Sequence, residues 1–272
     1  MTETRRKGSK STKDIPKEIL AQLNSGQIET ANLVEWLAVD QRLLLENLLK
    51  QSGRTTYLKP ILSSIDALKK QTVNTINETI GTGLFEQSLR NDDTEILAII
   101  SVHKSDLIRC WATYTIARNP KLNFSQKLEQ IQPFSADKHF GVREISWLAV
   151  RPDIAKNLTR SIEILSGWTG HKDENIRRFA SEATRPRGVW CEHIEPLKRD
   201  PALALTILEP LRSDPAKYVQ DSIGNWLNDA AKTRPGFVKQ LCGRWEKESE
   251  TKETWYILKK ALRTINKQPT DG

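Results

Sequence analysis

The chain has 272 residues, of which 38% are hydrophobic and 28% are charged, and its formal net charge is +8. This length suits one large or two small domains with a real core, and no apolar run approaches the roughly 20 residues that span a bilayer. The three cysteines are odd in number and none lies in a CxxC motif, which argues against a disulfide framework or a zinc site and favours a reducing compartment. We therefore expect a soluble protein without metal or cofactor.

In chain order, residues 1–15 are basic and lack the apolar region of a secretory signal. We expect them to form a disordered tail, followed by a single domain over residues 16–266 and a flexible C-terminus over 267–272. Within the domain, proline and glycine separate segments with helical periodicity, which predicts an all-α class. These breakers are Pro60, Gly81, Gly83, Pro120, Pro133, Pro152, Pro186, Pro201, Pro215 and Pro235.

Four of the predicted helical segments can be superposed. Each opens with a β-branched residue followed by a long polar one, at offsets of 34, 34 and 43 residues. The pairs are Ile108-Arg109, Val142-Arg143, Ile176-Arg177 and Val219-Gln220. Such a period, with two helices per unit, is typical of a HEAT-like helical-repeat solenoid, an α-α superhelix.

The helical period also predicts which residues of each repeat are buried. Residues four, seven and eight positions after the opener share its face and are expected in the core. Residues two, six and nine positions after it fall on the opposite side, which stacking turns into a concave surface. These surface columns are Cys110, Tyr114 and Ala117; Glu144, Leu148 and Arg151; Arg178, Glu182 and Arg185; and Asp221, Asn225 and Asn228.

The basic charge is concentrated beside these columns. From Lys104 to Trp190 there are 15 Lys or Arg residues against 9 Asp or Glu residues. Arginine forks bind phosphate, helix N-termini add backbone donors, and Asn225 and Asn228 can complete a clamp on a nucleic-acid backbone. The other interpretation is a solvated face with ion pairs, such as Arg178 with Glu182.

Glu144 is a carboxylate within this predicted basic face. It indicates either a salt bridge with Arg143 or Arg178, or a catalytic role. Phe140 lies one turn before it and Trp147 three residues after it. An aromatic ring beside a carboxylate stabilises a cationic base or sugar, although tryptophans in such helices are more often core residues.

Two segments, RRFASEATRPRGVW and YVQDSIGNWLNDAAKTRP, resemble the paired motifs of bacterial DNA alkylation repair glycosylases of the AlkC/AlkD superfamily. The resemblance runs from Ser105 to Thr264, and the first motif is closer to the AlkC branch. It implies an enzyme that hydrolyses the N-glycosidic bond of cationic N3- or N7-alkylated purines in duplex DNA. Such a base leaves without a general acid, so one carboxylate can stabilise the oxocarbenium-like sugar and position a water.

The resemblance places the catalytic carboxylate at Glu144, four residues after Phe140, and a phosphate-binding arginine at Arg178. The sequence departs from the AlkD pattern at two positions. Asn225 stands where that branch has a second aromatic residue, and Asn228 stands where it has a phosphate-binding arginine. Reserve candidates for the carboxylate are Glu182 and Asp229.

These inferences give one set of expectations. Glu144 is the predicted catalytic residue, and the expected partner is double-stranded DNA containing alkylated bases. We expect a monomer without a metal, in the bacterial cytoplasm and associated with the nucleoid. The alternative is a non-catalytic HEAT-like scaffold that binds DNA or protein. The predicted DNA contacts are Phe140, Arg143, Trp147, Arg151, Arg178, Arg185, Arg187, Asn225 and Asn228.

Overall fold

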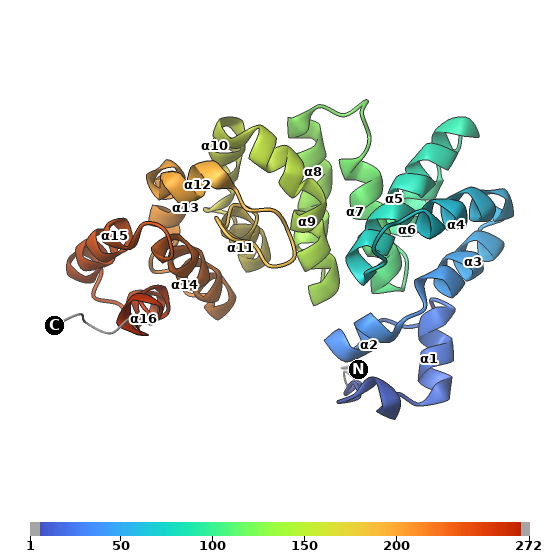
Figure 1. The fold of residues 1–272 in the computed structure, drawn as a ribbon, viewed down its shortest axis with the longest axis horizontal. Coiled ribbons are helices and arrows are strands. Elements are labelled where there is room, and N and C mark those ends of the chain that lie inside the picture. Colours follow the sequence, from blue (N-terminus) through green and yellow to red (C-terminus); the bar gives the residue numbers. More distant parts are fainter. Residues whose placement is uncertain (1–5, 268–272) are drawn as a thin grey trace. The chain divides into compact units, whose positions relative to one another are not determined.

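A computed structural model describes residues 6–267 of the chain, in which every regular element is a helix. The chain divides into two compact units, Met1–Ala149 and Val150–Gly272, and the boundary falls inside α9 (Phe140–Lys156). Both units are drawn in Figure 1. The predicted all-α class is therefore confirmed, and none of the helices within the described residues is long and apolar enough to cross a membrane.

The first unit, called unit 1, contains eight α-helices before α9 and two short 3-10 helices within its described residues. They are η1 (Thr12–Asp14), α1 (Lys17–Asn24), α2 (Leu33–Ala38), α3 (Gln41–Gln51), η2 (Thr55–Tyr57), α4 (Leu58–Asp66), α5 (Val73–Arg90), α6 (Ile96–Ser101), α7 (Asp106–Ala117) and α8 (Phe124–Ser135).

The second unit, called unit 2, begins with the last turns of α9. Its further elements are α10 (Leu158–Trp168), α11 (Glu174–Glu182), α12 (Glu195–Arg199), η3 (Pro201–Ala204), α13 (Leu205–Leu208), η4 (Glu209–Leu211), α14 (Lys217–Ala231), α15 (Pro235–Glu248), α16 (Lys252–Ala261) and η5 (Ile265–Lys267).

Helix starts follow local capping chemistry. Thr72 and Thr75 form a capping box at the start of α5, and Asn123 and Gln126 form another at α8. At α11 the carboxylate of Asp173 accepts from the Asn175 amide. Each cap satisfies backbone N–H groups that have no partner within the helix, so the sequence sets where these helices begin.

The buried face that the repeat predicts for each helix is confirmed. The openers and the residues four, seven and eight positions after them are all buried in α7, α9, α11 and α14. These are Ile108, Ala112 and Ile116; Val142, Ser146, Ala149 and Val150; Ile176, Ala180 and Ala183; and Val219, Ile223 and Leu227. Trp111 and Trp226 are also fully buried, as expected for core aromatics.

The predicted surface columns are only partly exposed. Every residue of α7 is buried, including Cys110 and Tyr114, because this helix packs against α5, α6 and α8. In unit 2, Arg151, Arg178, Glu182 and Asn228 are buried as well. The prediction of an exposed column is wrong at these positions, since a helix flanked on several sides has little solvent-facing surface.

Several predicted breakers lie inside helices. Pro133 is within α8 and Pro152 within α9, where each removes one backbone donor without ending the helix. Gly81 lies inside α5, and a Cβ added there would come within 2.5 Å of the Tyr114 Cβ and 2.6 Å of the Trp111 carbonyl oxygen. This glycine therefore permits close contact between α5 and α7, and its role as a breaker is corrected.

The long polar residue after each repeat opener has a shared structural task. Its side chain donates a hydrogen bond to the main-chain carbonyl six residues earlier, which the loop itself leaves without a partner. These bonds join Arg109 to His103 at 2.7 Å, Arg143 to Asp137 at 2.7 Å, Arg177 to His171 at 2.9 Å and Gln220 to Asp214 at 2.8 Å. We call them the repeat bonds.

Two of these arginines also reach the loop that precedes a following repeat helix. Arg109 Nε lies 2.7 Å from Asp137 Oδ2 in unit 1, and Arg177 Nε lies 2.6 Å from Asp214 Oδ2 in unit 2. Both arginines are mostly buried, so the ion pairs connect successive repeats within each unit. The repeated basic residue is thus explained by stacking.

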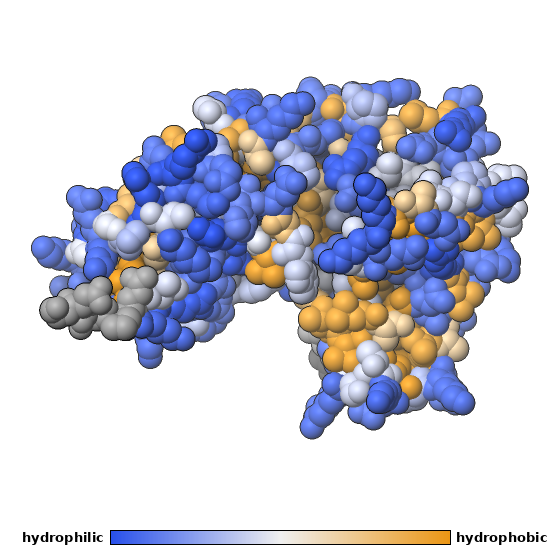
Figure 2. Space-filling model, in the orientation of Figure 1, coloured by the Kyte–Doolittle hydropathy of each residue, from blue (hydrophilic) through white to orange (hydrophobic). Residues whose placement is uncertain are grey.

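The described part of the predicted tail is packed into unit 1, to which it belongs. Arg6 pairs with the buried carboxylate of Glu35 at 2.6 Å, and Ile15 is buried. Residues 1–5 and 268–272 lie outside the described residues, so the predicted domain boundaries stay a prediction. Figure 2 shows apolar surface over α1 and α2, where Leu33 and Leu37 are exposed.

Candidate functional site

The predicted catalytic carboxylate lies on the second turn of α9. Glu144 is partly buried, and its Oε2 accepts a hydrogen bond of 2.9 Å from the indole Nε1 of Trp147. Trp147 is 4% exposed, so its ring belongs to the core. Phe140 begins the helix one turn earlier and packs against His139, with ring centroids 4.6 Å apart. The structure therefore brings Phe140, Glu144 and Trp147 onto one short stretch of helix.

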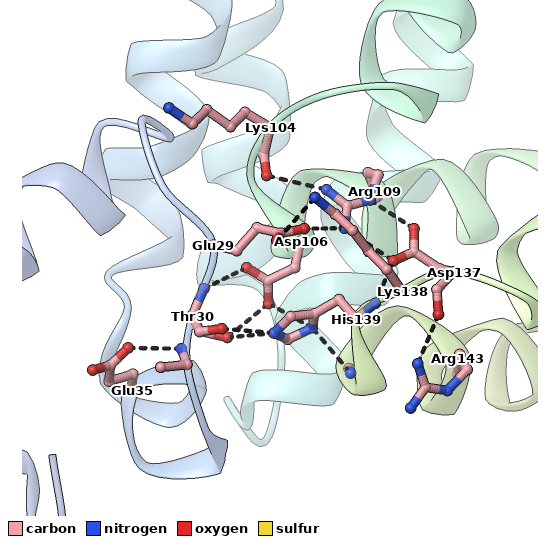
Figure 3. A network of polar contacts seen from close by, with 12 residues as sticks. Glu29, Thr30, Glu35, Lys104, Asp106, Arg109, Asp137, Lys138, His139 and Arg143 are labelled. Atoms are coloured by element: carbon pink, nitrogen blue, oxygen red, sulfur yellow. Dashed lines mark hydrogen bonds and ion pairs between the residues drawn. The ribbon is translucent and has the colours of Figure 1, made fainter. Parts of the chain in front are cut away.

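A buried polar network fixes the start of this helix, as Figure 3 shows. The carboxylate of Asp106 accepts from the Thr30 amide and hydroxyl, both at 2.9 Å. His139 Nε2 lies 2.8 Å from the Thr30 carbonyl oxygen, and His139 Nδ1 lies 3.1 Å from the Gly141 amide. With Nε2 donating and Nδ1 accepting, this arrangement ties the loop after α1, the start of α7 and the start of α9 together.

Burial dominates the electrostatics of this network. Asp106 is fully buried, and desolvation raises its pKa despite the nearby His139 and the hydrogen bonds from Thr30. Beside it, the pKa of Arg109 is raised: burial opposes the rise, and its bonds to Asp137 and Glu29 outweigh burial. These groups are satisfied inside unit 1, and their role is to support the helix that carries Glu144.

Unit 2 contains a second network, in which Glu182 is the central carboxylate. Its Oε1 lies 2.8 Å from Arg185 Nη1, and its Oε2 accepts a 2.7 Å hydrogen bond from Ser222 and lies 3.6 Å from Arg178 Nη2. Arg185 also pairs with Asp229 at 2.7 Å. The expected pair between Arg178 and Glu182 is therefore present, within a larger cluster.

The charges of this cluster compensate one another. Burial alone raises the pKa of Glu182, but the charges of Arg178 and Arg185 and the hydrogen bonds outweigh it, so the pKa is lowered. Both reserve carboxylates, Glu182 and Asp229, are nearly inaccessible, at 5% and 3% exposed. Their oxygens pair with the arginines of the cluster, and the choice of Glu144 as the catalytic carboxylate stays a prediction.

Arg178 has a neighbour that the sequence interpretation missed. Its guanidinium carbon lies 4.1 Å from the centre of the Tyr218 ring, a cation–π distance. Tyr218 comes directly before Val219, the opener of the fourth repeat. The superposition of repeats contains this aromatic residue, and it could have indicated a ring close to the arginine column. The ring and Glu182 together hold this arginine in place.

The other predicted contacts differ in how they are placed. Arg151 is buried, and its guanidinium donates to the carbonyls of Ala183, Arg185 and Glu192. The side-chain oxygen of Asn228 is also buried and accepts two hydrogen bonds from Thr264. Both side chains thus serve packing within unit 2.

Two predicted contacts lie nearer the surface. Asn225 is partly exposed on α14. Arg187 is partly exposed, and among the residues that the structure describes none forms a hydrogen bond or ion pair with it. Whether these residues bind DNA stays a prediction, as does the expected alignment of Glu144 with Arg178 and Arg185. Within residues 6–267, no group of three or more His, Cys, Asp or Glu side chains is placed to hold a metal ion.

Comparison with known proteins identifies similar sequences. Residues 141–265 match the model of the DNA alkylation repair enzyme family. The uncharacterized protein YhaZ of Bacillus subtilis (strain 168) is 40% identical over 123 residues, which are 45% of this chain and 34% of YhaZ. The aligned segment thus spans about a third of that relative. The resemblance predicted from the sequence is confirmed over this part of the chain.

Two solved structures share the architecture. One is the Pseudomonas fluorescens alkylpurine DNA glycosylase AlkC bound to DNA containing an abasic site analog, with a TM-score of 0.67, 21% identity, and coverage of 96% of this chain and 66% of that one. The other is AlkD2 from Streptococcus mutans, with a TM-score of 0.57, 20% identity, and coverage of 76% and 97%. These likenesses confirm the helical-repeat fold.

Proposed function

Because residues 141–265 match the DNA alkylation repair enzyme family, we propose that this protein is a DNA repair glycosylase. Its substrate is duplex DNA that contains cationic N3- or N7-alkylated purines, and it hydrolyses the bond between base and sugar. The family match is the observation that carries this proposal. The likeness in fold to an alkylpurine DNA glycosylase over 96% of the chain supports it.

Glu144 is the proposed catalytic carboxylate. An alkylated purine already carries positive charge, so its departure leaves an oxocarbenium-like sugar that a nearby negative charge stabilises. The indole of Trp147 donates to Glu144 at 2.9 Å, which orients the carboxylate before substrate arrives. The same carboxylate can direct a water to the sugar, so that one residue serves both needs.

The arginines of unit 2 are the proposed phosphate contacts. Arg187 is partly exposed and, among the described residues, has no hydrogen bond or ion pair, and a phosphate oxygen is the acceptor that a guanidinium prefers. Arg178 and Arg185 are the further proposed phosphate contacts, and Glu182 and Asp229 fix the positions of their guanidinium groups. The other predicted residues remain proposed contributors to DNA binding, and the buried ones contribute through packing. They are Phe140, Arg143, Trp147, Arg151, Asn225 and Asn228.

Release of alkylated bases from methylated duplex DNA tests the proposal. Wild type should release free bases, and Glu144→Gln should lower the rate by at least about 100-fold, as loss of a key electrostatic group does. Duplex affinity should be unchanged or higher, because the substitution removes a negative charge. Glu129→Gln on the exposed face of α8 is the matched control and should release bases at the wild-type rate.

Two outcomes contradict parts of the proposal. Wild type that binds duplex DNA and releases nothing indicates the alternative, a non-catalytic scaffold. Equal release by wild type and Glu144→Gln moves the chemistry to another residue. A salt titration separates nucleic-acid binding from protein binding, since phosphate contacts weaken steeply with added salt.

A further inference from the structure

Between α11 and α12, the loop formed by residues 186–194 presents two apolar side chains, Val189 and Trp190, to solvent. Val189 is 54% exposed and Trp190 is 71% exposed, whereas Trp111, Trp226 and Trp245 are fully buried in the two cores. Figure 1 draws this segment as a wide coil between the two helices. An indole at a loop tip exposes a large apolar surface that folding of this chain does not cover.

The backbone at this tip is strained. Trp190 has a φ of 62°, and among the described residues the only other non-glycine with a positive φ is Asp92. Aspartate tolerates this conformation, whereas a bulky aromatic rarely adopts it. Such strain persists only where the surrounding structure imposes it, and it collects at binding sites.

Both ends of the loop are fixed by unit 2. The Arg151 guanidinium donates to the carbonyls of Ala183 and Arg185 before the loop and of Glu192 within it. The Ile194 amide closes the loop on the Pro186 carbonyl at 3.1 Å. These bonds explain why the strained conformation is held.

The inside of the loop is also closely packed. A Cβ added at Gly188 would overlap the sulfur of Cys191 and come within 3.2 Å of the Arg151 guanidinium. The loop is therefore held rigidly by unit 2, with a closely packed interior and an apolar tip.

The charges of the loop indicate the class of partner. Arg187 comes just before the exposed pair and, among the described residues, has no hydrogen bond or ion pair. The acid of the loop, Glu192, follows the exposed pair. An arginine without a hydrogen bond or ion pair, three residues before an exposed aromatic ring, suits a phosphate next to a nucleobase, because the guanidinium fork binds the phosphate and the ring stacks on the base.

We infer that the loop 186–194 is a DNA-reading element in which Trp190 stacks on a nucleobase, or fills the space of a missing one, while Arg187 binds the adjacent phosphate. The inference rests on the proposed function and adds a contact for the damaged region of the duplex. Apolar side chains inserted at a base step are an established way to hold distorted DNA. The supported loop gives such a side chain a fixed direction.

The test measures the dissociation constants of two duplexes, one intact and one with an abasic-site analogue, over a range of salt concentrations. Trp190→Ala should weaken binding about tenfold, as loss of one base-stacking contact does, with the larger effect on the abasic duplex. Its salt dependence should match wild type, since no phosphate contact is lost. Arg187→Ala should instead reduce the slope of log K against log salt by about 0.9.

Three further variants separate a binding role from a structural one. Trp190→Gly removes the strain at positive φ, so its unfolding midpoint should equal or exceed that of wild type while its DNA affinity falls. Trp190→Phe keeps a stacking ring and should bind nearly as wild type does. Trp255→Ala, at a tryptophan that is 51% exposed on α16, is the matched control and should leave binding unchanged.

The outcomes distinguish the inference from the proposed function. If wild type binds DNA and both Trp190→Ala and Trp190→Gly bind as tightly as wild type, the proposed role of the loop is overturned and the proposed function stands. If Trp255→Ala weakens binding as much as Trp190→Ala, a specific role for the loop is likewise overturned. If wild type binds neither duplex, the proposed function fails, and the inference fails with it.

Discussion

The buried carboxylate of Glu182 should contribute far more to stability than an exposed one in the same geometry. The chain offers a matched comparison, because Arg185 and Glu182 are three residues apart and 2.8 Å from each other, and Arg160 and Glu163 are three residues apart and 2.7 Å from each other. Their side chains are 11% and 6% exposed in the first pair and 57% and 66% in the second. The two pairs thus differ in burial and in the further contacts of Glu182 with Ser222 and Arg178.

The perturbation is Glu182→Gln, with Glu163→Gln as its control. Removing one partner of a buried ion pair costs about 3–5 kcal/mol, because the other charge remains in a poorly solvated place. Arg185 keeps its 2.7 Å contact with Asp229, so we expect the lower end of that range, about 3 kcal/mol. The exposed pair should contribute about 0–1 kcal/mol.

The assay is denaturant unfolding, followed by circular dichroism, over a range of pH. Because the pKa of Glu182 is lowered from its ordinary value of 4.5, its stabilisation is present above that value and is lost as pH falls through the folded-state pKa. The gap between wild type and Glu182→Gln should therefore be full near neutral pH and shrink in acid. A loss below about 1 kcal/mol at neutral pH, no larger than that of an exposed pair, would refute the reasoning.

Two further predictions concern helix packing and the carboxylate on α9. Gly81→Ala should lower the free energy of unfolding by about 1–3 kcal/mol through overpacking, whereas Gly167→Ala in α10, with no atom within 4 Å of the added Cβ, should raise it by about 0.5–1 kcal/mol; thermal unfolding of both variants checks this, and equal effects contradict it. Trp147→Phe removes the donor to Glu144 and should slow base release about tenfold, the size of a lost hydrogen bond to a charged group, while duplex affinity should fall far less than the rate because a ring remains at this position. Single-turnover release and a binding titration measure the two quantities, and an unchanged rate would show that the indole N–H has no positioning role.

Most of the core could be predicted from the sequence because a helix repeats its faces regularly. Val142, Ala149 and Ile176 lie where the period places them, inside the units. The period says nothing about what covers the opposite face. For this reason Arg178 was expected at a surface, whereas Tyr218 and Glu182 enclose it.

Glycine and proline were the least informative signals. Gly81 permits close packing against Tyr114, and from sequence alone such a glycine looks like one that ends a helix. The roles of Arg109 and Arg177 depend on acids 28 and 37 residues further along the chain. Contacts over such separations follow from the stacking of repeats, which local patterns do not contain.

The repeat bonds have a consequence for how the chain can vary. Their acceptors at residues 103, 137, 171 and 214 are main-chain carbonyls, which every amino acid provides. Replacing a side chain at these sites leaves the acceptor unaltered. Adding or deleting one residue between acceptor and donor moves the oxygen out of reach. The repeat bonds therefore restrict the length of these turns more than their sequence, and at Asp137 and Asp214 an ion pair also requires the side chain.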